Sequence, residues 1–182
     1  MKHRIFAAAL AAMLMLTGCG KSGTASSTTA ASTSSVADID EDESFFRELY
    51  IYDLNNKYNQ LLTDQNAFFE ANNNSNYAED VQDLDVDAFF AAAEKCISTL
   101  EAIIAIEPPE SLASYHEQLI KGAQYEIKFF NGVIQASKYD LGELEMSAQE
   151  VEELQAFFTE YTEAETNLFV DAYSAVMEAA AQ

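Results

Sequence analysis

The chain contains no tryptophan and only two prolines, six glycines and two cysteines in 182 residues. So few prolines and glycines argue against an all-β protein, because such a fold needs many tight turns. The absence of tryptophan removes the side chain that stacks best on sugar rings, so a glycoside hydrolase is not expected. These absences favour a helical protein.

Positive charge is also scarce, since nine Lys and Arg residues stand against 31 Asp and Glu residues, for a net charge of −22. A surface of this charge repels nucleic acid and anionic headgroups, so no nucleic-acid partner is expected. Cationic partners, calcium and plain solubility all remain open. The hydrophobic content of 49% is ample for a packed interior, and the length suits one domain with tails.

The N-terminus has the pattern of a signal peptide. The basic residues Lys2, His3 and Arg4 precede an unbroken apolar run at residues 5–16. This run is too short to span a bilayer as a stable anchor. Residues 16–19, Leu-Thr-Gly-Cys, then resemble the lipobox of bacterial lipoproteins, in which an apolar residue and two small or neutral residues precede an invariant cysteine.

The lipobox resemblance implies that a signal peptidase cuts between Gly18 and Cys19 and that the Cys19 thiol carries a diacylglycerol. Two or three acyl chains anchor a protein stably, whereas one binds only marginally. The protein is therefore expected to be lipid-anchored to the cell membrane on its extracytoplasmic side. An ordinary secretory signal with a coincidental cysteine, or a single transmembrane anchor, would be the alternatives.

Residues 20–37 are rich in Ser, Thr, Ala and Gly and have little to bury. They predict a flexible spacer of about 25 Å that separates the folded domain from the membrane. We therefore expect a signal peptide at 1–18, a lipid-attached cysteine with a disordered linker at 19–41, and a helical domain at 42–182. Loss of Lys2 and Arg4 leaves seven basic residues and a net charge near −24.

From residue 42 onward, apolar residues recur at helical spacing in four segments, at about 42–72, 87–105, 109–137 and 147 to near the C-terminus. The short connections predict an all-α fold, an up-down-up-down antiparallel four-helix bundle. The expected core positions are Phe45, Leu49, Tyr52, Leu54, Tyr58, Leu61, Gln65 and Phe68 in the first segment, Phe89, Phe90, Ala93, Cys96, Ile97, Leu100, Ile103 and Ile104 in the second, Leu112, His116, Leu119, Ala123, Ile127, Phe130 and Ile134 in the third, and Val151, Leu154, Phe158, Tyr161, Ala164, Leu168, Ala172 and Ala175 in the fourth.

Local sequence signals indicate where these helices begin, end or bend. The two prolines at 108–109 predict a tight break between the second and third segments. Ser147 and Glu150 have the spacing of a capping box at the start of the fourth. Gly122 and Gly132 fall inside the third segment, where they would mark close helix contacts or a bend, and the helix could also end early at Gly132.

Asp83, Asp85, Asp87 and Glu94 resemble positions one, three, five and twelve of an EF-hand calcium loop. Ala88 stands where that loop needs glycine, and the helical pattern that begins at Asp87 competes with the loop. The competing interpretation is that Asp85 or Asp87 caps the helix. We therefore expect no metal site here and only weak cation binding.

No catalytic constellation is present. A ferritin-like di-iron bundle needs Glu-x-x-His pairs, yet His116, the only histidine beyond the signal peptide, has Ala113 three residues before it. One histidine and one free cysteine are too few for a His/Cys zinc site. Neither a Gly-rich phosphate loop nor a G-x-S-x-G motif occurs. We expect no enzyme activity and no cofactor.

These observations favour a non-catalytic binding or interaction module on the cell envelope, and the sequence does not name its target. The alternative is an accessory lipoprotein that binds a small ligand or a cation, for transport or envelope sensing. A solid helical core would favour the first function. A cavity ringed by Tyr115, His116, Tyr125 or Tyr161 would favour the second.

Overall fold

The computed structural model describes residues 41–76, 85–164 and 166–182, and these residues are helical without any strand. The all-α prediction is therefore confirmed for this part of the chain. The predicted signal peptide, Cys19 and the linker up to residue 40 lie outside the described residues, as does Asp83. The helices in chain order are α2 (Glu41–Asn76), α3 (Val86–Ile104), the short 3-10 helix η2 (Glu110–Leu112), α4 (Ala113–Leu141), α5 (Ala148–Glu163) and α6 (Leu168–Ala180).

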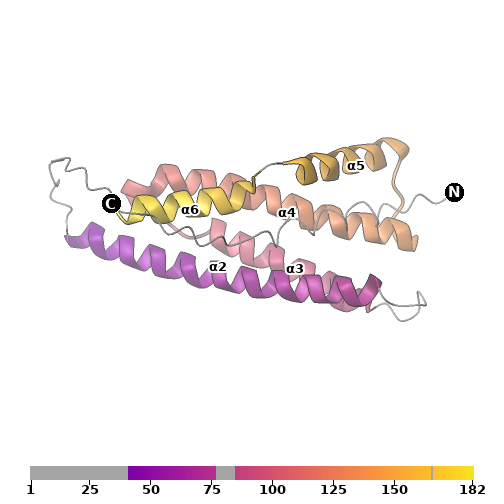
Figure 1. The fold of residues 1–182 in the computed structure, drawn as a ribbon, viewed down its shortest axis with the longest axis horizontal. Helices are drawn as coiled ribbons and strands as arrows, with labels where there is room; N and C mark the ends of the chain where they lie inside the picture. The colour runs from indigo at the N-terminus through magenta and orange to yellow at the C-terminus, as the bar shows by residue number, and fades with distance from the viewer. Residues whose placement is uncertain (1–40, 77–84, 165) are drawn as a thin grey trace, which may run out of the picture.

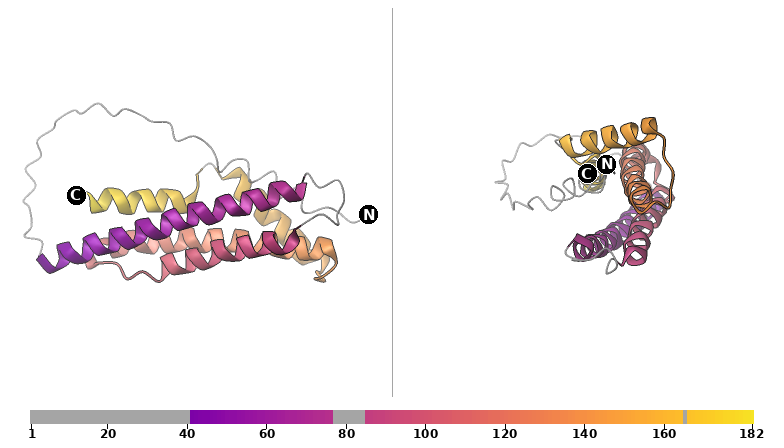
Figure 2. Two further views of the ribbon diagram at one scale, coloured as in Figure 1. Left: turned by 90° about the horizontal axis from the view of Figure 1, so that it is seen from below. Right: turned by 90° about the vertical axis from the view of Figure 1, so that its right-hand side faces the viewer.

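Helices α2, α3, α4 and α6 lie along one long axis, as Figure 1 shows, and α5 crosses it obliquely (Figure 2). Helix α2 packs along α3, α3 packs along α4, and α4 packs along α6. Helix α5 lies over the C-terminal half of α4 and makes much less contact with it than α6 does with α4. Seen along the long axis, α2, α3, α4 and α6 surround a common interior, α6 also contacts α2, and α5 is set on the outside (Figure 2).

Helix α2 is much longer than its partner α3, at 36 residues against 19. At 1.5 Å per residue the difference is about 25 Å, so the N-terminal turns of α2 extend beyond the end of α3 (Figure 2). The predicted core positions Phe45, Leu49 and Tyr52 are wrong, because they are 64%, 45% and 65% exposed. Leu49 lies beyond the end of α3, whereas Phe45 and Tyr52 lie on the side of α2 opposite to the buried Tyr50 and Leu54. The buried face of α2 begins at Tyr50 and continues through Leu54, Leu61 and Phe68.

Helix α3 matches its prediction closely. Five of its eight expected core residues are fully buried: Phe89, Ala93, Cys96, Leu100 and Ile103. The other three, Phe90, Ile97 and Ile104, are partly buried and pack against the core. Asp85 caps the helix, since its side chain accepts a hydrogen bond from the Ala88 amide at 3.0 Å. Cys96 is a free thiol, and burial, together with the nearby charge of Asp64, raises its pKa to about 12. Such a thiol is unreactive at neutral pH.

Helix α4 runs through both of its glycines, so the alternative in which it ends at Gly132 is wrong. It ends at Gly142, which adopts the left-handed conformation at φ +79° that glycine tolerates best. Gly122 lies against the start of α6, because a Cβ atom built there would be only 2.6 Å from the Phe169 Cα. The glycine is what allows the two backbones to approach.

The predicted fourth helix is two helices, so the expectation of one continuous segment is wrong. The capping box at its start is confirmed, with reciprocal Ser147 and Glu150 hydrogen bonds. The break follows Glu163, and Asn167 caps α6 by accepting from the Phe169 and Val170 amides at 3.0 Å each. The buried face then shifts by one residue, so that α6 buries Phe169, Ala172, Val176 and Ala179 and leaves Leu168 exposed.

Candidate functional site

The four candidate ligand-binding residues, Tyr115, His116, Tyr125 and Tyr161, do not gather at one place in the described part of the chain. Tyr115 is 41% exposed at the surface of α4. His116 is buried and its Nδ1 lies 2.8 Å from the hydroxyl oxygen of Tyr50 on α2. Tyr125 and Tyr161 stack on each other at 5.5 Å between ring centroids. Nine residues of α4, about 13 Å, separate His116 from Tyr125, so of the four candidates the structure brings only Tyr125 and Tyr161 into contact.

The Tyr50–His116 pair is a core contact between α2 and α4. Burial lowers the pKa of His116, and the Ile104 carbonyl opposes that effect more weakly. Burial also raises the pKa of Tyr50 to about 12. Both rings are therefore neutral at physiological pH, and their hydrogen bond joins the first residue of the buried face of α2 to α4. Sequence reasoning placed His116 in the core but did not find its partner.

A buried carboxylate joins α4 to the break between α5 and α6. Glu126 is 2% exposed, and its two oxygens accept hydrogen bonds from the Tyr161 hydroxyl at 2.9 Å and the Asn167 amide at 3.1 Å. Burial raises the pKa of Glu126, while the two hydrogen bonds oppose the shift. Burial and the nearby Glu126 charge raise the pKa of Tyr161. Glu126 on α4 thus holds both Tyr161 near the end of α5 and Asn167 at the start of α6. These hydrogen bonds give the cluster a structural role in joining the three helices.

Glu126 was missed in the sequence, although a signal for it existed. It stands three residues after Ala123 and four before Phe130, within the apolar stripe of its helix. A second buried carboxylate, Asp64, accepts hydrogen bonds from Thr99 at 2.7 Å and Gln60 at 2.9 Å, and so ties α2 to α3. Both carboxylates join helices, and neither residue lines the grooves described below.

The candidate metal ligands do not converge. Asp85 serves as the cap of α3, and Asp87 and Glu94 are exposed on the same helix seven residues apart. Within the ranges that the structure describes, no three His, Cys, Asp or Glu side chains gather in a way that could hold a metal ion.

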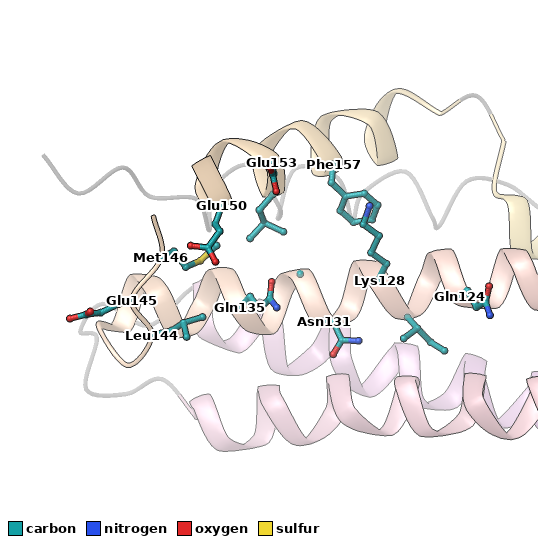
Figure 3. A pocket seen from close by; sticks show the side chains of 13 residues that line it. Gln124, Lys128, Asn131, Gln135, Leu144, Glu145, Met146, Glu150, Glu153 and Phe157 are labelled. Atoms are coloured by element: carbon teal, nitrogen blue, oxygen red, sulfur yellow. The ribbon is translucent and has the colours of Figure 1, made fainter. Parts of the chain in front are cut away.

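A groove of about 680 Å³ lies between α4 and α5 (Figure 3). Its polar lining includes Gln124, Asn131 and Gln135 on α4, and Glu150 and Glu153 on α5. The Lys128 ammonium reaches across it to lie 4.1 Å from the centre of the Phe157 ring. The lining is thus a mixture of acidic, basic, amide and apolar side chains. The candidate ligand-binding residues are not among them: Tyr115, His116, Tyr125 and Tyr161.

A second groove, of about 840 Å³, lies where α2 extends past the end of α3. We call it the acidic groove. Its lining comes from the first turns of α2 and the connection from α3 to η2: Glu43, Phe46, Leu49, Tyr50, Asp53, Ala105, Ile106, Glu107, Pro108, Pro109 and Glu110. Four of these residues are acidic and none is basic. The groove therefore combines an apolar floor with a negative rim.

Arg47, the one basic residue in the first turns of α2, does not line the acidic groove. Its guanidinium donates a hydrogen bond to the Ala179 carbonyl at the C-terminal end of α6. A cation in this position complements the partial negative charge of the helix end. The carboxylates of the groove are thus left without a basic side chain from the same stretch of α2.

None of the helices in the described ranges has the length and apolarity needed to cross a membrane. Comparisons of the chain with models of protein families, with curated proteins and with solved structures found no match.

Proposed function

We propose that this protein is a lipid-anchored, extracytoplasmic interaction module with no catalytic role, and that the N-terminal end of α2 is its binding surface. The observation that carries the proposal is the exposure of Phe45, Phe46, Leu49 and Tyr52, at 64%, 59%, 45% and 65%. Four large apolar side chains within eight residues form a patch of the kind that soluble proteins keep for partners.

The location rests on the sequence. The lipobox resemblance assigns the anchor to Cys19, and the Ser- and Thr-rich residues 20–37 supply a spacer before α2 begins at Glu41. The exposed patch then begins four residues into the first helix, so along the chain it is the part of the folded domain closest to the anchor. In this proposal α5 and α6 together take the place of the last helix of an up-down-up-down bundle.

The non-catalytic role is supported by the way the buried titratable groups are used. His116, Asp64 and Glu126 each make a hydrogen bond to a neighbouring helix. Their partners are Tyr50, Thr99 and Tyr161 respectively. None of the three lines either groove. A general acid or base must reach a substrate to act, and these groups are positioned to connect helices.

The anchor is tested by expressing the full chain in a bacterial host. Mass spectrometry should find an acylated Cys19 as the new N-terminus, and the protein should partition into detergent. The Cys19→Ser variant should lose both properties. A variant that is cleaved at the same bond and stays equally membrane-bound would contradict the lipid anchor.

The interaction surface is tested in the same cells with a photo-crosslinking residue at position 46. Position 115 on α4 serves as the control, because Tyr115 is also exposed but lies outside the patch. We expect a discrete crosslinked product from position 46 and none from position 115. Equal labelling at both positions would show that the patch has no preferred partner.

A second candidate function, binding of a small polar ligand, is favoured by the three amide side chains that line the α4–α5 groove. Amides donate and accept hydrogen bonds and suit an uncharged polar ligand. Thermal melts against a panel of sugars, amino acids and amides would test it. A saturable rise in melting temperature that is lost in Gln135→Ala, and kept in the control variant Gln118→Ala on the exposed face of α4, would support this function.

A further inference from the structure

The apolar floor of the acidic groove is formed by side chains that the fold leaves uncovered. Phe46 is 59% exposed and Leu49 is 45% exposed, and across from them lie Ile106 and the two prolines of the connection. These prolines are rigid and hold the connection in an extended shape. The floor is therefore preformed, and no helix of the described chain packs onto it.

The rim has charge of one sign. Glu43 and Asp53 lie on α2, and Glu107 and Glu110 lie on the facing connection. Within the described ranges, none of these four carboxylates pairs with a basic side chain. Carboxylates on both sides of a groove repel one another, and a positively charged occupant would relieve that repulsion.

We propose that the acidic groove binds a cationic amphipathic polypeptide segment, with apolar side chains on Phe46 and Leu49 and Lys or Arg side chains on the carboxylate rim. This inference rests on the proposed function and names the class of partner. A helix whose apolar residues recur every three or four positions lays one face into such a groove and presents its charges to both rims.

Charge complementarity selects this occupant over two others. A second copy of the chain would bring the same carboxylates against each other, which costs free energy. A bilayer with anionic headgroups would likewise face four carboxylates at close range. A basic segment is the occupant for which the apolar floor and the acidic rim are both favourable.

The test uses the chain without its first 18 residues and with Cys19→Ser. This protein keeps every residue that the structure describes, and the described buried side chains all lie between Tyr50 and Ala179. The probe is a synthetic peptide of leucine and lysine of about 14 residues, four helical turns, with leucines at helical spacing. Two control peptides carry glutamate in place of lysine, or serine in place of leucine. Binding is followed by calorimetry at physiological ionic strength.

Two matched pairs of variants locate the binding. Glu107→Gln with Glu110→Gln neutralises one rim, whereas Glu94→Gln with Glu101→Gln removes the same charge from the exposed face of α3. Phe46→Ser alters the floor, whereas Leu62→Ser alters a 42% exposed apolar side chain farther along α2 that neither lines the groove nor belongs to the exposed patch. The altered side chains are intermediate or exposed, so all four proteins should fold, and circular dichroism verifies this.

We expect the leucine–lysine peptide to bind at one site, and both control peptides to bind at least about fivefold more weakly. The rim pair and Phe46→Ser should each weaken binding by about fivefold or more, and their matched controls by less than about twofold. Equal weakening by the α3 control pair would overturn the proposal, because attraction to the whole acidic surface would then explain the binding. An absence of binding would also overturn it.

Sedimentation of the same protein tests the competing occupant, since a dimer that Phe46→Ser disperses would show that a second copy covers the groove. The peptide experiment does not depend on Cys19. If the peptide does not bind, the proposed cationic partner is refuted, whereas the membrane anchor and the crosslinking at position 46 are unaffected. If instead the anchor or the crosslinking experiment fails, the peptide-binding result still stands.

Discussion

The contact between Gly122 and α6 predicts opposite outcomes for two glycine-to-alanine substitutions in α4. At Gly122 a new Cβ would lie 2.6 Å from the Phe169 Cα, 2.8 Å from its amide nitrogen and 2.9 Å from the Leu168 carbonyl oxygen. These are backbone atoms, and no side-chain rotation can move them. Ordinary contact begins near 3.4 Å, so the start of α6 would have to retreat by about 0.8 Å.

Two effects oppose each other in Gly122→Ala. Alanine in a helix interior gains about 1 kcal/mol over glycine. Overpacking against fixed atoms costs about 1–3 kcal/mol, and three backbone contacts place this site at the upper end. We expect a net loss of about 1–2 kcal/mol in the free energy of unfolding, or a fall of about 3–8 °C in melting temperature.

Gly132→Ala is the matched control. There the new Cβ would meet only side-chain atoms, the Leu154 Cδ1 at 3.0 Å and the Phe158 ring at 3.3 Å. Those side chains can adjust, so helix propensity should dominate and the variant should be unchanged or stabilised by up to about 1 kcal/mol.

Urea unfolding followed by circular dichroism measures both variants. Limited proteolysis gives a second readout, because displaced packing of α6 should expose the connection at residues 164–167. The reasoning would be refuted if Gly122→Ala stabilised the protein as much as Gly132→Ala, since α4 and α6 would then not be in close backbone contact.

Three further predictions concern the core, a buried carboxylate and calcium. Leu100→Ala should destabilise the protein by about 2–5 kcal/mol in urea unfolding, because Leu100, near the C-terminal end of α3, is 0% exposed, and a loss below about 1 kcal/mol would place it outside the core. Burial raises the pKa of Glu126, so the protonated side chain contributes stability to the folded protein. This contribution is complete at pH values below the usual glutamate pKa and is lost as the pH rises through the raised pKa. Melting temperature should thus fall over that range more in the native protein than in Glu126→Gln, and identical pH profiles would contradict the buried carboxylate. Calcium and magnesium at millimolar concentration should raise the melting temperature equally, by relief of charge repulsion alone; a calcium-selective, saturable transition at micromolar concentration would instead indicate a built site that includes Asp85 and Asp87.

The local features of the chain were predictable because they depend on neighbours in sequence. Five apolar residues of α3 at helical spacing, from Phe89 to Ile103, fixed both its bounds and its buried face. Asp85 and Ser147 are capping residues whose partners lie three positions ahead. The break before η2 follows from the consecutive prolines 108–109. Each of these signals acts within about one helical turn, so the sequence alone contains it.

The tertiary structure decided which faces are covered and which polar residues meet. The stripe of Phe45, Leu49 and Tyr52 has helical spacing, yet it is exposed, because α3 ends before reaching Leu49 and because Phe45 and Tyr52 lie on the side of α2 opposite to the buried Tyr50 and Leu54. The same shortfall leaves the acidic groove open. Helical periodicity identifies an apolar face, but whether that face is buried depends on the length and position of another helix.

The break between α5 and α6 was decided in the same way. Residues 163–168 alone are compatible with a continuing helix, and the predicted stripe ran through Ala164 and Leu168. The break occurs where Asn167 both caps α6 and donates a hydrogen bond to Glu126, and where Phe169 meets Gly122. Glu126 and Gly122 lie more than 40 residues earlier in the chain, so only the folded arrangement of α4 against α6 brings together the groups that make two helices more stable here than one.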